Sequence, residues 1–238
     1  MKIIVLGNSK YKENDFIYNA ISEDESFSFK VCGGQSNKSQ YVWLNNPLTI
    51  AEIEFGDRRF KYPSLKEAKL IESPLTLDND LTYLCTVSVI TEVVNKTLPE
   101  QERYLFFKDI EQSLAALKAG KDKLMVLLIL LARATKLAGG ELEVDKCVFC
   151  GKTSDIIAFS FADGGFVCRD CFEDSAANTD LTPNQMLLIR YIFKAPNYSC
   201  PSSDKFSEED KMVILRHMRE YFIDDLGIGI DSISSLLK

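Results

Sequence analysis

The chain has 238 residues, of which 46% are hydrophobic, and it carries a formal net charge of −7. This composition is typical of a globular protein with one large domain or two small ones, and it excludes a disordered or fibrous chain. Because lysine and arginine make the contacts to phosphate, the negative balance also excludes a broad basic face that wraps nucleic acid. Any DNA-binding surface must therefore be local.

The first 75 residues predict a series of short β-strands. Several runs alternate polar and apolar side chains, as half-buried strands do, and turn residues such as Gly33-Gly34 and Asn45-Asn46-Pro47 separate them. So many short strands make a small barrel or sandwich, and the barrel is favoured because it leaves no exposed strand edge. We expect strands at residues 3–6, 16–21, 27–32, 41–44, 50–55 and 66–71.

From Asp78 to Cys147, and again after Cys171, the apolar residues recur with a helical period. Capping residues predict where the helices begin, among them Thr97, Thr182 and Ser207. The apolar run 124–132 is far shorter than the roughly 20 residues that cross a bilayer, so it predicts a buried helix and no membrane contact. We expect helices from Asp78–Asp80 to about residue 95, from Thr97 onward, and over residues 123–137, 186–193 and 211–226.

Besides the closely spaced pairs Cys147/Cys150 and Cys168/Cys171, the chain contains three cysteines. These are Cys32, Cys85 and Cys200, an odd number without the spacing of a disulfide framework. Thiols of this kind are typical of a reducing compartment. The opening residues, Met1 to Gly7, predict a strand rather than a secretory leader. We therefore expect a cytoplasmic protein.

Two Cys-x-x-Cys pairs carry the most specific chemistry in the chain. Cys147 and Cys150 form the first pair, Cys168 and Cys171 form the second, and 17 residues separate the pairs. An apolar segment broken by Asp163-Gly164-Gly165 lies between them and predicts a hairpin. Two such turns held together supply four sulfurs in the tetrahedral arrangement that zinc accepts, so we expect one zinc ion.

A zinc ion with four sulfur ligands has no open coordination position, so the predicted site is structural. The catalytic alternative is a deaminase, which combines Cys-x-x-Cys with an upstream His-x-Glu and leaves water on the metal. The chain contains one histidine, His217, which follows both pairs. This excludes the deaminase arrangement, and we expect His217 to occupy a solvated position on a helix.

The order of strands, helices, cysteine hairpin and helices resembles the RecO family of bacterial recombination mediators. The cysteine region matches best, with Cys-x-x-Cys-Gly, an aromatic strand, Gly164-Gly165 and Cys-x-x-Cys. Two loops differ from the family pattern: Lys12 replaces a glycine in the Tyr-Gly-Glu-x-Asp turn, and Gln35 and Ser36 replace two arginines in the Gly-Ala-Arg-Arg-x-x-Ser loop. Asp231 stands where a lysine is common. Further matches are Leu181-Thr182-Pro183, Leu187-Leu188-Ile189-Arg190-Tyr191 and Leu226-Gly227.

The resemblance implies an α+β protein with an oligonucleotide-binding (OB-fold) β-barrel at residues 1–76 and an all-α helical domain at residues 77–238. A four-cysteine zinc hairpin at residues 145–174 would be inserted in the helical domain. The implied function is non-enzymatic: the protein would bind single-stranded DNA, anneal complementary strands and, with RecR, help to load RecA. The alternative, motivated by the acidity and the missing arginines, is a protein-interaction or regulatory module with little direct DNA binding.

Within the predicted barrel, aromatic faces suit stacking on bases and cations suit phosphates. The candidate DNA-binding residues are Lys38, Tyr41, Trp43, Arg58, Arg59 and Lys61. The two aromatic residues could instead belong to the barrel core, and the two arginines to a solvated turn. These alternatives stay open on the sequence.

The resemblance also implies a groove on the helical domain for the acidic C-terminal tail of single-stranded-DNA-binding protein. A tail that ends in hydrophobic residues and a carboxylate needs an apolar pocket with basic residues at its rim. Lys121, Lys123 and Arg133 surround the apolar helix and are the candidates, although they could simply flank a core helix.

Overall fold

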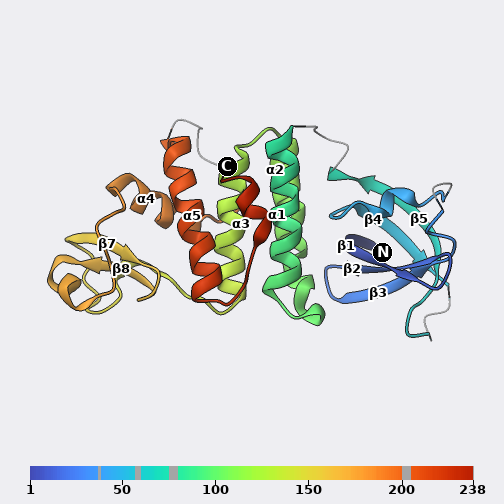
Figure 1. The fold of residues 1–238 in the computed structure, drawn as a ribbon, viewed down its shortest axis with the longest axis horizontal. Coiled ribbons are helices and arrows are strands. Elements are labelled where there is room, and N and C mark those ends of the chain that lie inside the picture. The colour runs from blue at the N-terminus through green and yellow to red at the C-terminus, as the bar shows by residue number, and fades with distance from the viewer. Residues whose placement is uncertain (37–38, 57–59, 75–79, 200–204, 238) are drawn as a thin grey trace. The chain divides into compact units, whose positions relative to one another are not determined.

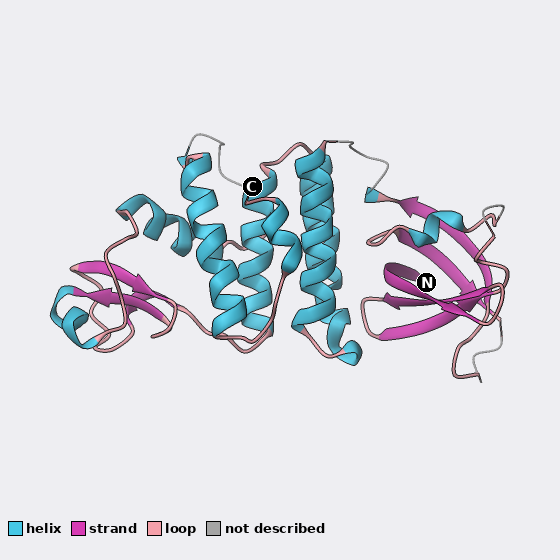
Figure 2. Cartoon of the chain, viewed as in Figure 1, coloured by secondary structure: helices cyan, strands magenta, loops and turns pink. Residues whose placement is uncertain are grey.

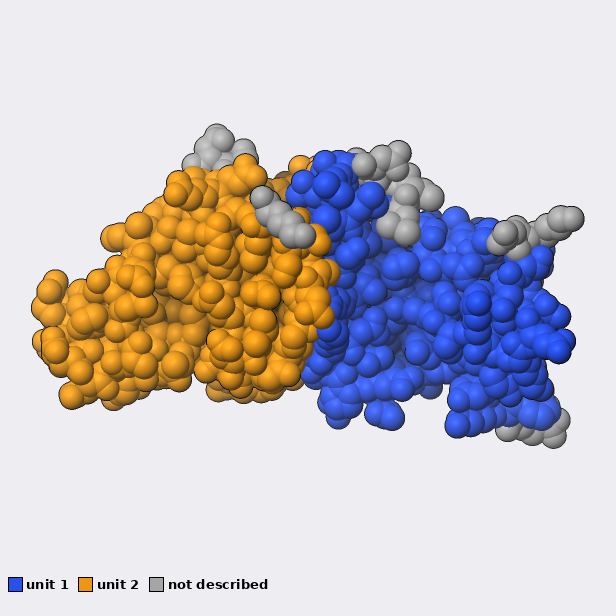
Figure 3. Space-filling view, in the orientation of Figure 1, with its two compact units in different colours: residues 1–114 blue, residues 115–238 orange. Residues whose placement is uncertain are grey.

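The computed structural model describes residues 1–36, 39–56, 60–74, 80–199 and 205–237. The chain divides into two compact units, residues 1–114 and residues 115–238 (Figure 3). Unit 1 contains an antiparallel sheet and the first helices, and unit 2 contains the remaining helices and a small second sheet (Figures 1 and 2). A mixed α+β protein with an N-terminal sheet and a helical C-terminal part is confirmed. The domain boundary after residue 76 stays a prediction.

The sheet of unit 1 has five antiparallel strands in the order β3-β2-β1-β4-β5. Five of the predicted strands are confirmed, although β1 extends well beyond the predicted residues 3–6. β3 is linked to the segment just before β5, where Lys30 N donates to Pro63 O at 3.0 Å and Lys30 bridges Ser64. The strands are β1 (Lys2–Tyr11), β2 (Asp15–Ile21), β3 (Ser26–Val31), β4 (Ile50–Phe55) and β5 (Leu65–Glu72).

The strand predicted at residues 41–44 is wrong, because Val42–Asn45 forms a short 3-10 helix, η1. Leu44 is fully buried in the core of the sheet, and Tyr41 and Trp43 pack against the same core. An alternating strand would send Trp43 to the face opposite Leu44, whereas a tight helical turn lets all three side chains cover the core. Trp43 Nε1 donates to Gln40 O at 2.9 Å and holds the turn.

The helices of unit 1 are α1 (Leu81–Thr97), the 3-10 helix η3 (Glu100–Phe106) and α2 (Phe107–Lys118), which continues into unit 2. Asp80 caps α1 by accepting from Tyr83 N, as predicted. The predicted cap at Thr97 is wrong: Thr97 is the last residue of α1, and Leu98 is extended. The proline that follows explains this ending, because it disfavours helical dihedrals at the residue before it.

The described α-helices that lie wholly in unit 2 are α3 (Lys123–Leu137), α4 (Pro183–Lys194) and α5 (Glu208–Asp224), and the 3-10 helix η6 (Asp231–Ser235) follows α5. The predicted caps at Thr182 and Ser207 are confirmed, and Asp122 caps α3. Every side chain from Leu124 to Ala132 is buried, which confirms the predicted core helix. Among the described residues, no helix combines the length and the apolar character that crossing a membrane requires.

A second sheet lies between α3 and α4 in the chain, with strands in the order β6-β8-β7. β7 and β8 are antiparallel neighbours, as the predicted hairpin requires, while β6 and β8 are parallel. The strands are β6 (Glu143–Cys147), β7 (Ile156–Ser160) and β8 (Gly165–Cys168), and the 3-10 helix η4 (Arg169–Asp174) follows.

Candidate metal centre and nucleic-acid surface

The four paired cysteines lie together at one edge of the second sheet. Because β6 and β8 are parallel neighbours, their carboxyl ends meet at the same edge, and these ends are Cys147 and Cys168. The turn after β6 carries Cys150, and η4 carries Cys171. The four Sγ atoms all lie within 4.8 Å of one another. The structure thus brings together all four sulfurs that the sequence pairs.

The spacing of the sulfurs suits a metal ion. Tetrahedral coordination with bonds of about 2.3 Å places ligand sulfurs about 3.8 Å apart. The sulfurs of Cys150 and Cys168 are 3.6 Å apart, close to this value. Cys147 and Cys168 are buried, whereas Cys150 is exposed. The cluster, which we call the cysteine centre, could therefore hold one metal ion near the surface.

The environment of the thiols also favours a bound cation. Burial raises the pKa of the Cys147 thiol, but backbone N–H groups, first that of Cys150 and then that of Cys168, donate to its sulfur and bring the pKa down to about 6. Burial, followed by hydrogen bonding to the neighbouring thiols, raises the pKa of Cys171 to about 12. A cation among the crowded sulfurs would favour their deprotonated form, which is the form that binds a metal.

Two glycines and one lysine shape the cysteine centre. A Cβ at Gly165 would lie 2.5 Å from Glu143 O, so glycine is needed where β6 approaches β8. Gly151 has a φ of +73°, which closes the first cysteine turn. Lys152 pairs with Asp170 at 3.0 Å and Asp155 at 3.2 Å, and so ties the two cysteine turns together.

The turn between β7 and β8 packs on α5 through the ring of Phe161. The ring of Phe161 stacks on His217, with centroids 6.1 Å apart and planes at 14°, and it also contacts Tyr221 at 5.3 Å. The prediction that His217 is helical is confirmed, but its side chain is only 31% exposed rather than fully solvated. The ring that covers His217 belongs to the turn between β7 and β8, so the helical periodicity of α5 gave no sign of it.

The predicted DNA-binding residues have different positions in the structure. Tyr41 and Trp43 are half-buried against the core, with ring centroids 6.3 Å apart. Lys61 is exposed, and its Nζ lies 5.2 Å from the centroid of the Tyr62 ring. Lys38, Arg58 and Arg59 lie outside the described residues. Of the candidates that can be placed, Lys61 has the exposure that a DNA contact requires.

Around Lys61 the fold gathers residues that the sequence reasoning missed. A hollow of about 300 Å³ joins the ends of β1 and β3 and the segment before β5. The rings of Tyr11 and Tyr62 meet edge to face at 6.2 Å, and Lys12 Nζ lies 5.5 Å from the centroid of the Tyr11 ring. The aromatic–lysine cluster, as we call it, consists of Tyr11, Lys12, Lys30, Phe60, Lys61 and Tyr62.

The adjacent pairs Tyr11-Lys12 and Lys61-Tyr62 were the available sequence signal for this cluster. Each pair by itself is a common surface feature. It was the bridge between β3 and the segment before β5 that brought them to one place.

Comparison with known proteins gives the family. A family model described as "Recombination protein O C terminal" matches residues 78–232. The chain belongs to the RecO family. It is similar to the DNA repair protein RecO of Bacillus pumilus, with 32% identity over 232 residues that cover 96% of this chain and 90% of that protein. It is also similar to the DNA repair protein RecO of Thermoanaerobacter sp., with 27% identity over 228 residues that cover 92% and 90% of the two chains.

The RecO resemblance stated from the sequence is therefore confirmed. The match to the RecO C-terminal model includes the cysteine centre, whereas the aromatic–lysine cluster lies before it, in residues 11–62.

The glycine loop at residues 33–36, which departs from the RecO pattern, is hydrogen-bonded to residues at and beside the turn between β1 and β2. Gln35 Nε2 donates to Asp15 O at 2.8 Å and to Lys12 O at 3.3 Å, and Gly33 N donates to the Asp15 carboxylate at 2.9 Å. Gln35 therefore fastens the glycine loop to the turn between β1 and β2. Gln35, which stands in place of an arginine of the RecO pattern, thus supports the turn that carries Lys12 of the aromatic–lysine cluster.

The residues predicted for a RecO partner groove are not close together. Lys121 and Lys123 lie at the start of α3, and Arg133 lies about 15 Å further along the same helix. Arg133 Nη2 donates to Ala195 O at 2.6 Å, after the end of α4. A hollow of about 310 Å³ on α4 has a better composition for an acidic apolar ligand, with Leu187, Tyr191, Ala195 and Pro196 beside Arg190, Lys194 and Lys205.

Proposed function

We propose that this chain is a DNA repair and recombination mediator that binds single-stranded DNA at the aromatic–lysine cluster and anneals complementary strands. The observation that carries the proposal is the juxtaposition of three aromatic rings and three lysines from separate segments of unit 1. The curated relatives, which are DNA repair proteins, support the same role. Annealing needs phosphate neutralisation and base stacking, and it needs no nucleotide hydrolysis.

We propose further that residues 1–76 form an OB-fold barrel. The bridge between Lys30 of the outer strand β3 and Ser64, just before the other outer strand β5, supports closure. Proteins of this fold bind oligonucleotides at the loop between the first two strands and the loop between the last two. Lys12 comes from the first of these loops, and Phe60, Lys61 and Tyr62 come from the second. The cluster therefore occupies the usual ligand position of the fold.

The proposed binding mode assigns one task to each kind of side chain. Exposed aromatic rings stack on bases, and each stacked base contributes about 1–3 kcal/mol without regard to its identity. Lysines release counterions from the phosphates, which makes affinity fall as salt rises. Because the lysines are few and the chain is acidic, we expect weak binding that is sensitive to salt.

The test is binding of a fluorescent single-stranded oligonucleotide over a range of salt concentrations, followed by an annealing assay. Lys61→Ala should weaken binding and reduce the slope of log affinity against log salt by about 0.7. Lys69→Ala, which removes an exposed lysine from β5 outside the cluster, is the matched control and should leave the slope unchanged. If the zinc-loaded protein neither binds nor anneals DNA at low salt, with or without RecR, the proposal is wrong.

The cysteine centre is proposed to hold one structural zinc ion through Cys147, Cys150, Cys168 and Cys171. The all-sulfur donor set and its spacing support zinc. When bound, the ion supplies the positive charge that keeps the thiols deprotonated. The chain's own residues fix the geometry, because β6 and β8 place two ligands, and the turns joined by Lys152 place the other two.

The partners proposed are RecR, the acidic C-terminal tail of single-stranded-DNA-binding protein and, indirectly, RecA. For the tail we propose the hollow on α4, because its three basic residues surround apolar side chains. The test is anisotropy of a labelled acidic peptide that ends in apolar residues. Arg190→Glu should reduce its affinity at least about tenfold, and Lys121→Glu should change it little. If Lys121→Glu reduces the affinity and Arg190→Glu does not, the tail binds at the start of α3 instead.

The alternative is an acidic protein-interaction module with little DNA binding. The net charge of −7 and the use of Gln35 inside the glycine loop favour this reading. The two functions differ in the salt-dependent assay, because such a module would bind the tail peptide but would show no binding to the oligonucleotide at any salt concentration.

A further inference from the structure

A second hollow in unit 1 has a chemistry different from that of the aromatic–lysine cluster. Its volume is about 570 Å³, within the range of ligand sites, and it lies between the start of β3, the segment before β5 and the start of η3. Phe60, Lys61 and Tyr62 belong to both hollows. The remaining lining residues are Glu25, Ser26, Phe27, Ser28, Phe55, Pro63, Glu100 and Gln101.

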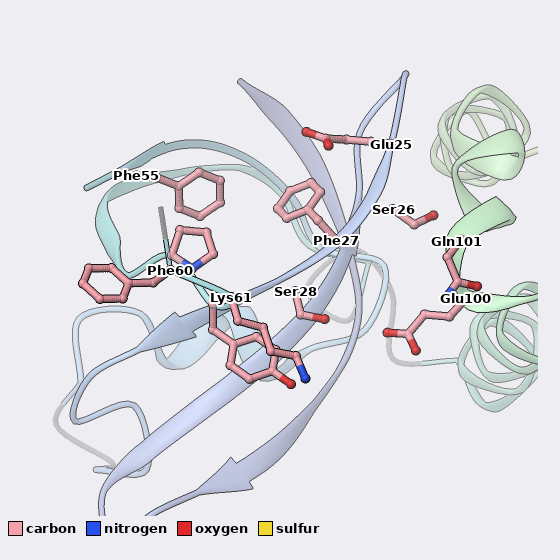
Figure 4. A pocket seen from close by; sticks show the side chains of 11 residues that line it. Glu25, Ser26, Phe27, Ser28, Phe55, Phe60, Lys61, Glu100 and Gln101 are labelled. Atoms are coloured by element: carbon pink, nitrogen blue, oxygen red, sulfur yellow. The ribbon is translucent and has the colours of Figure 1, made fainter. Parts of the chain in front are cut away.

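Two kinds of side chain face each other across this hollow, which we call the acidic aromatic pocket. Figure 4 shows Phe55 and Phe60 on one side and Glu25 and Glu100 on the other. The rings of Phe27 and Phe55 meet edge to face at 5.7 Å and form part of the wall. Phe60 is 69% exposed, which is a high value for a large apolar side chain. The pocket therefore combines ring surface with negative charge.

The charges of the pocket argue against a phosphate backbone as its occupant. Glu25 and Glu100 are both exposed, and among the described residues neither carboxylate has a cationic partner. Lys61 is the one cation among the described lining residues, and its Nζ lies over the Tyr62 ring. Two carboxylates against one ammonium repel phosphate and attract a positive group.

The side chain that matches this combination is arginine. Its guanidinium stacks on aromatic rings, donates in a planar fork to carboxylates and is more weakly hydrated than an ammonium group, so its burial costs less. Arginine and aromatic residues are also the commonest anchors of protein interfaces. We propose that the acidic aromatic pocket binds an arginine, together with a neighbouring apolar side chain, from a basic segment of a protein partner.

The probe for this proposal is an acetylated and amidated hexapeptide of alternating arginine and leucine, and its counterpart has glutamate in place of arginine. Binding to the full-length zinc-loaded protein is followed by amide chemical shifts. The arginine peptide should shift the amides of Ser26, Ser28 and Gln101, and the glutamate peptide should not. Shifts spread over the whole acidic surface would overturn the proposal, because they would show attraction to net charge alone.

The variant that tests the pocket is Glu25→Gln with Glu100→Gln, which should lower the affinity for the arginine peptide about tenfold or more. The matched control, Glu52→Gln with Glu102→Gln, removes the same charge from exposed positions of unit 1 outside the lining. All four positions are exposed, so both variants should fold. Equal affinities in the two variants would overturn the proposal.

Lys61→Gln separates this proposal from DNA binding, because the residue belongs to both hollows. Removing its charge should raise the affinity for the arginine peptide severalfold and lower the affinity for the single-stranded oligonucleotide. If both ligands weaken together, the pocket belongs to the DNA path and the proposal fails. If the amides of the pocket shift with protein concentration and without peptide, a second copy of the chain is the occupant and the proposal also fails.

Discussion

The cysteine centre and the aromatic–lysine cluster are built in opposite ways. The cysteine centre draws its ligands from residues 147–171, and two local turns fix their geometry. The aromatic–lysine cluster draws on three segments between residues 11 and 62, which only the pairing of distant strands brings together. A metal ion held by all four sulfurs would have no open position for a substrate, whereas the aromatic–lysine cluster is open. The clearest motif in the sequence thus marks the proposed structural site, and the proposed binding site lies where the sequence is least conspicuous.

The largest expected effect comes from Cys168→Ser. Structural zinc contributes about 10–16 kcal/mol to the folding of small zinc domains, so losing one ligand should release the metal and unfold the second sheet. Elemental analysis and thermal unfolding measure the two effects. Cys32→Ser, an exposed cysteine of unit 1, is the control and should keep one zinc per chain. A well-folded wild-type sample without metal would contradict the zinc assignment.

The second large effect concerns a buried ion pair and tests whether the stability of unit 2 depends on the metal alone. Lys211 on α5 has a side chain only 7% exposed and pairs with Asp122, the cap of α3. Asp122→Ala should cost about 3–5 kcal/mol in the free energy of unfolding, because it leaves a buried ammonium without its partner. The double variant with Lys211→Met should recover much of this loss. Urea unfolding measures both, and an unchanged deficit in the double variant would show that the cap matters more than the charge.

A moderate effect is expected when one exposed phenylalanine is removed from the aromatic–lysine cluster, and the cysteine centre provides the comparison. Phe60 in the aromatic–lysine cluster is 69% exposed, and Phe149 between the first two cysteines is 49% exposed. Phe60→Ala should cost about 1–3 kcal/mol in affinity for a single-stranded oligonucleotide, the usual contribution of a stacked base. Phe149→Ala should leave this affinity unchanged. If the oligonucleotide responds to Phe149 instead, the division of roles between the two regions is wrong.

The smallest effect concerns an ion pair of unit 1. The side-chain hydrogen bond from Lys108 lowers the pKa of Glu23. A lowered folded-state pKa means that the pair stabilises the protein above the ordinary glutamate range, near pH 4, and that this stability is lost as pH falls through the folded-state value. Glu23→Gln should therefore lower the melting temperature slightly at pH 7, and the difference should narrow towards pH 3. A difference that grows on acidification would contradict the assignment.

The sequence by itself determined the features that depend on neighbouring residues. Caps such as Thr182 and Ser207, the buried run of α3 and the cysteine pairs follow from local hydrogen bonding, periodicity and ligand spacing, and the structure contains each of them. The wrong strand at residues 41–44 marks the limit of that reasoning. Tyr41, Trp43 and Leu44 all turn towards one core, and a local pattern cannot show where that core lies.

Only the tertiary structure decided which exposed residues share a surface. Tyr11 and Tyr62 are 51 positions apart, yet their rings touch because β3 bridges the segment before β5. Arg133 and Lys121 are 12 positions apart on the chain but lie towards opposite ends of α3. Helix and strand formation depends on contacts between near neighbours, whereas a binding surface depends on long-range pairing, which leaves no periodic signal in the sequence.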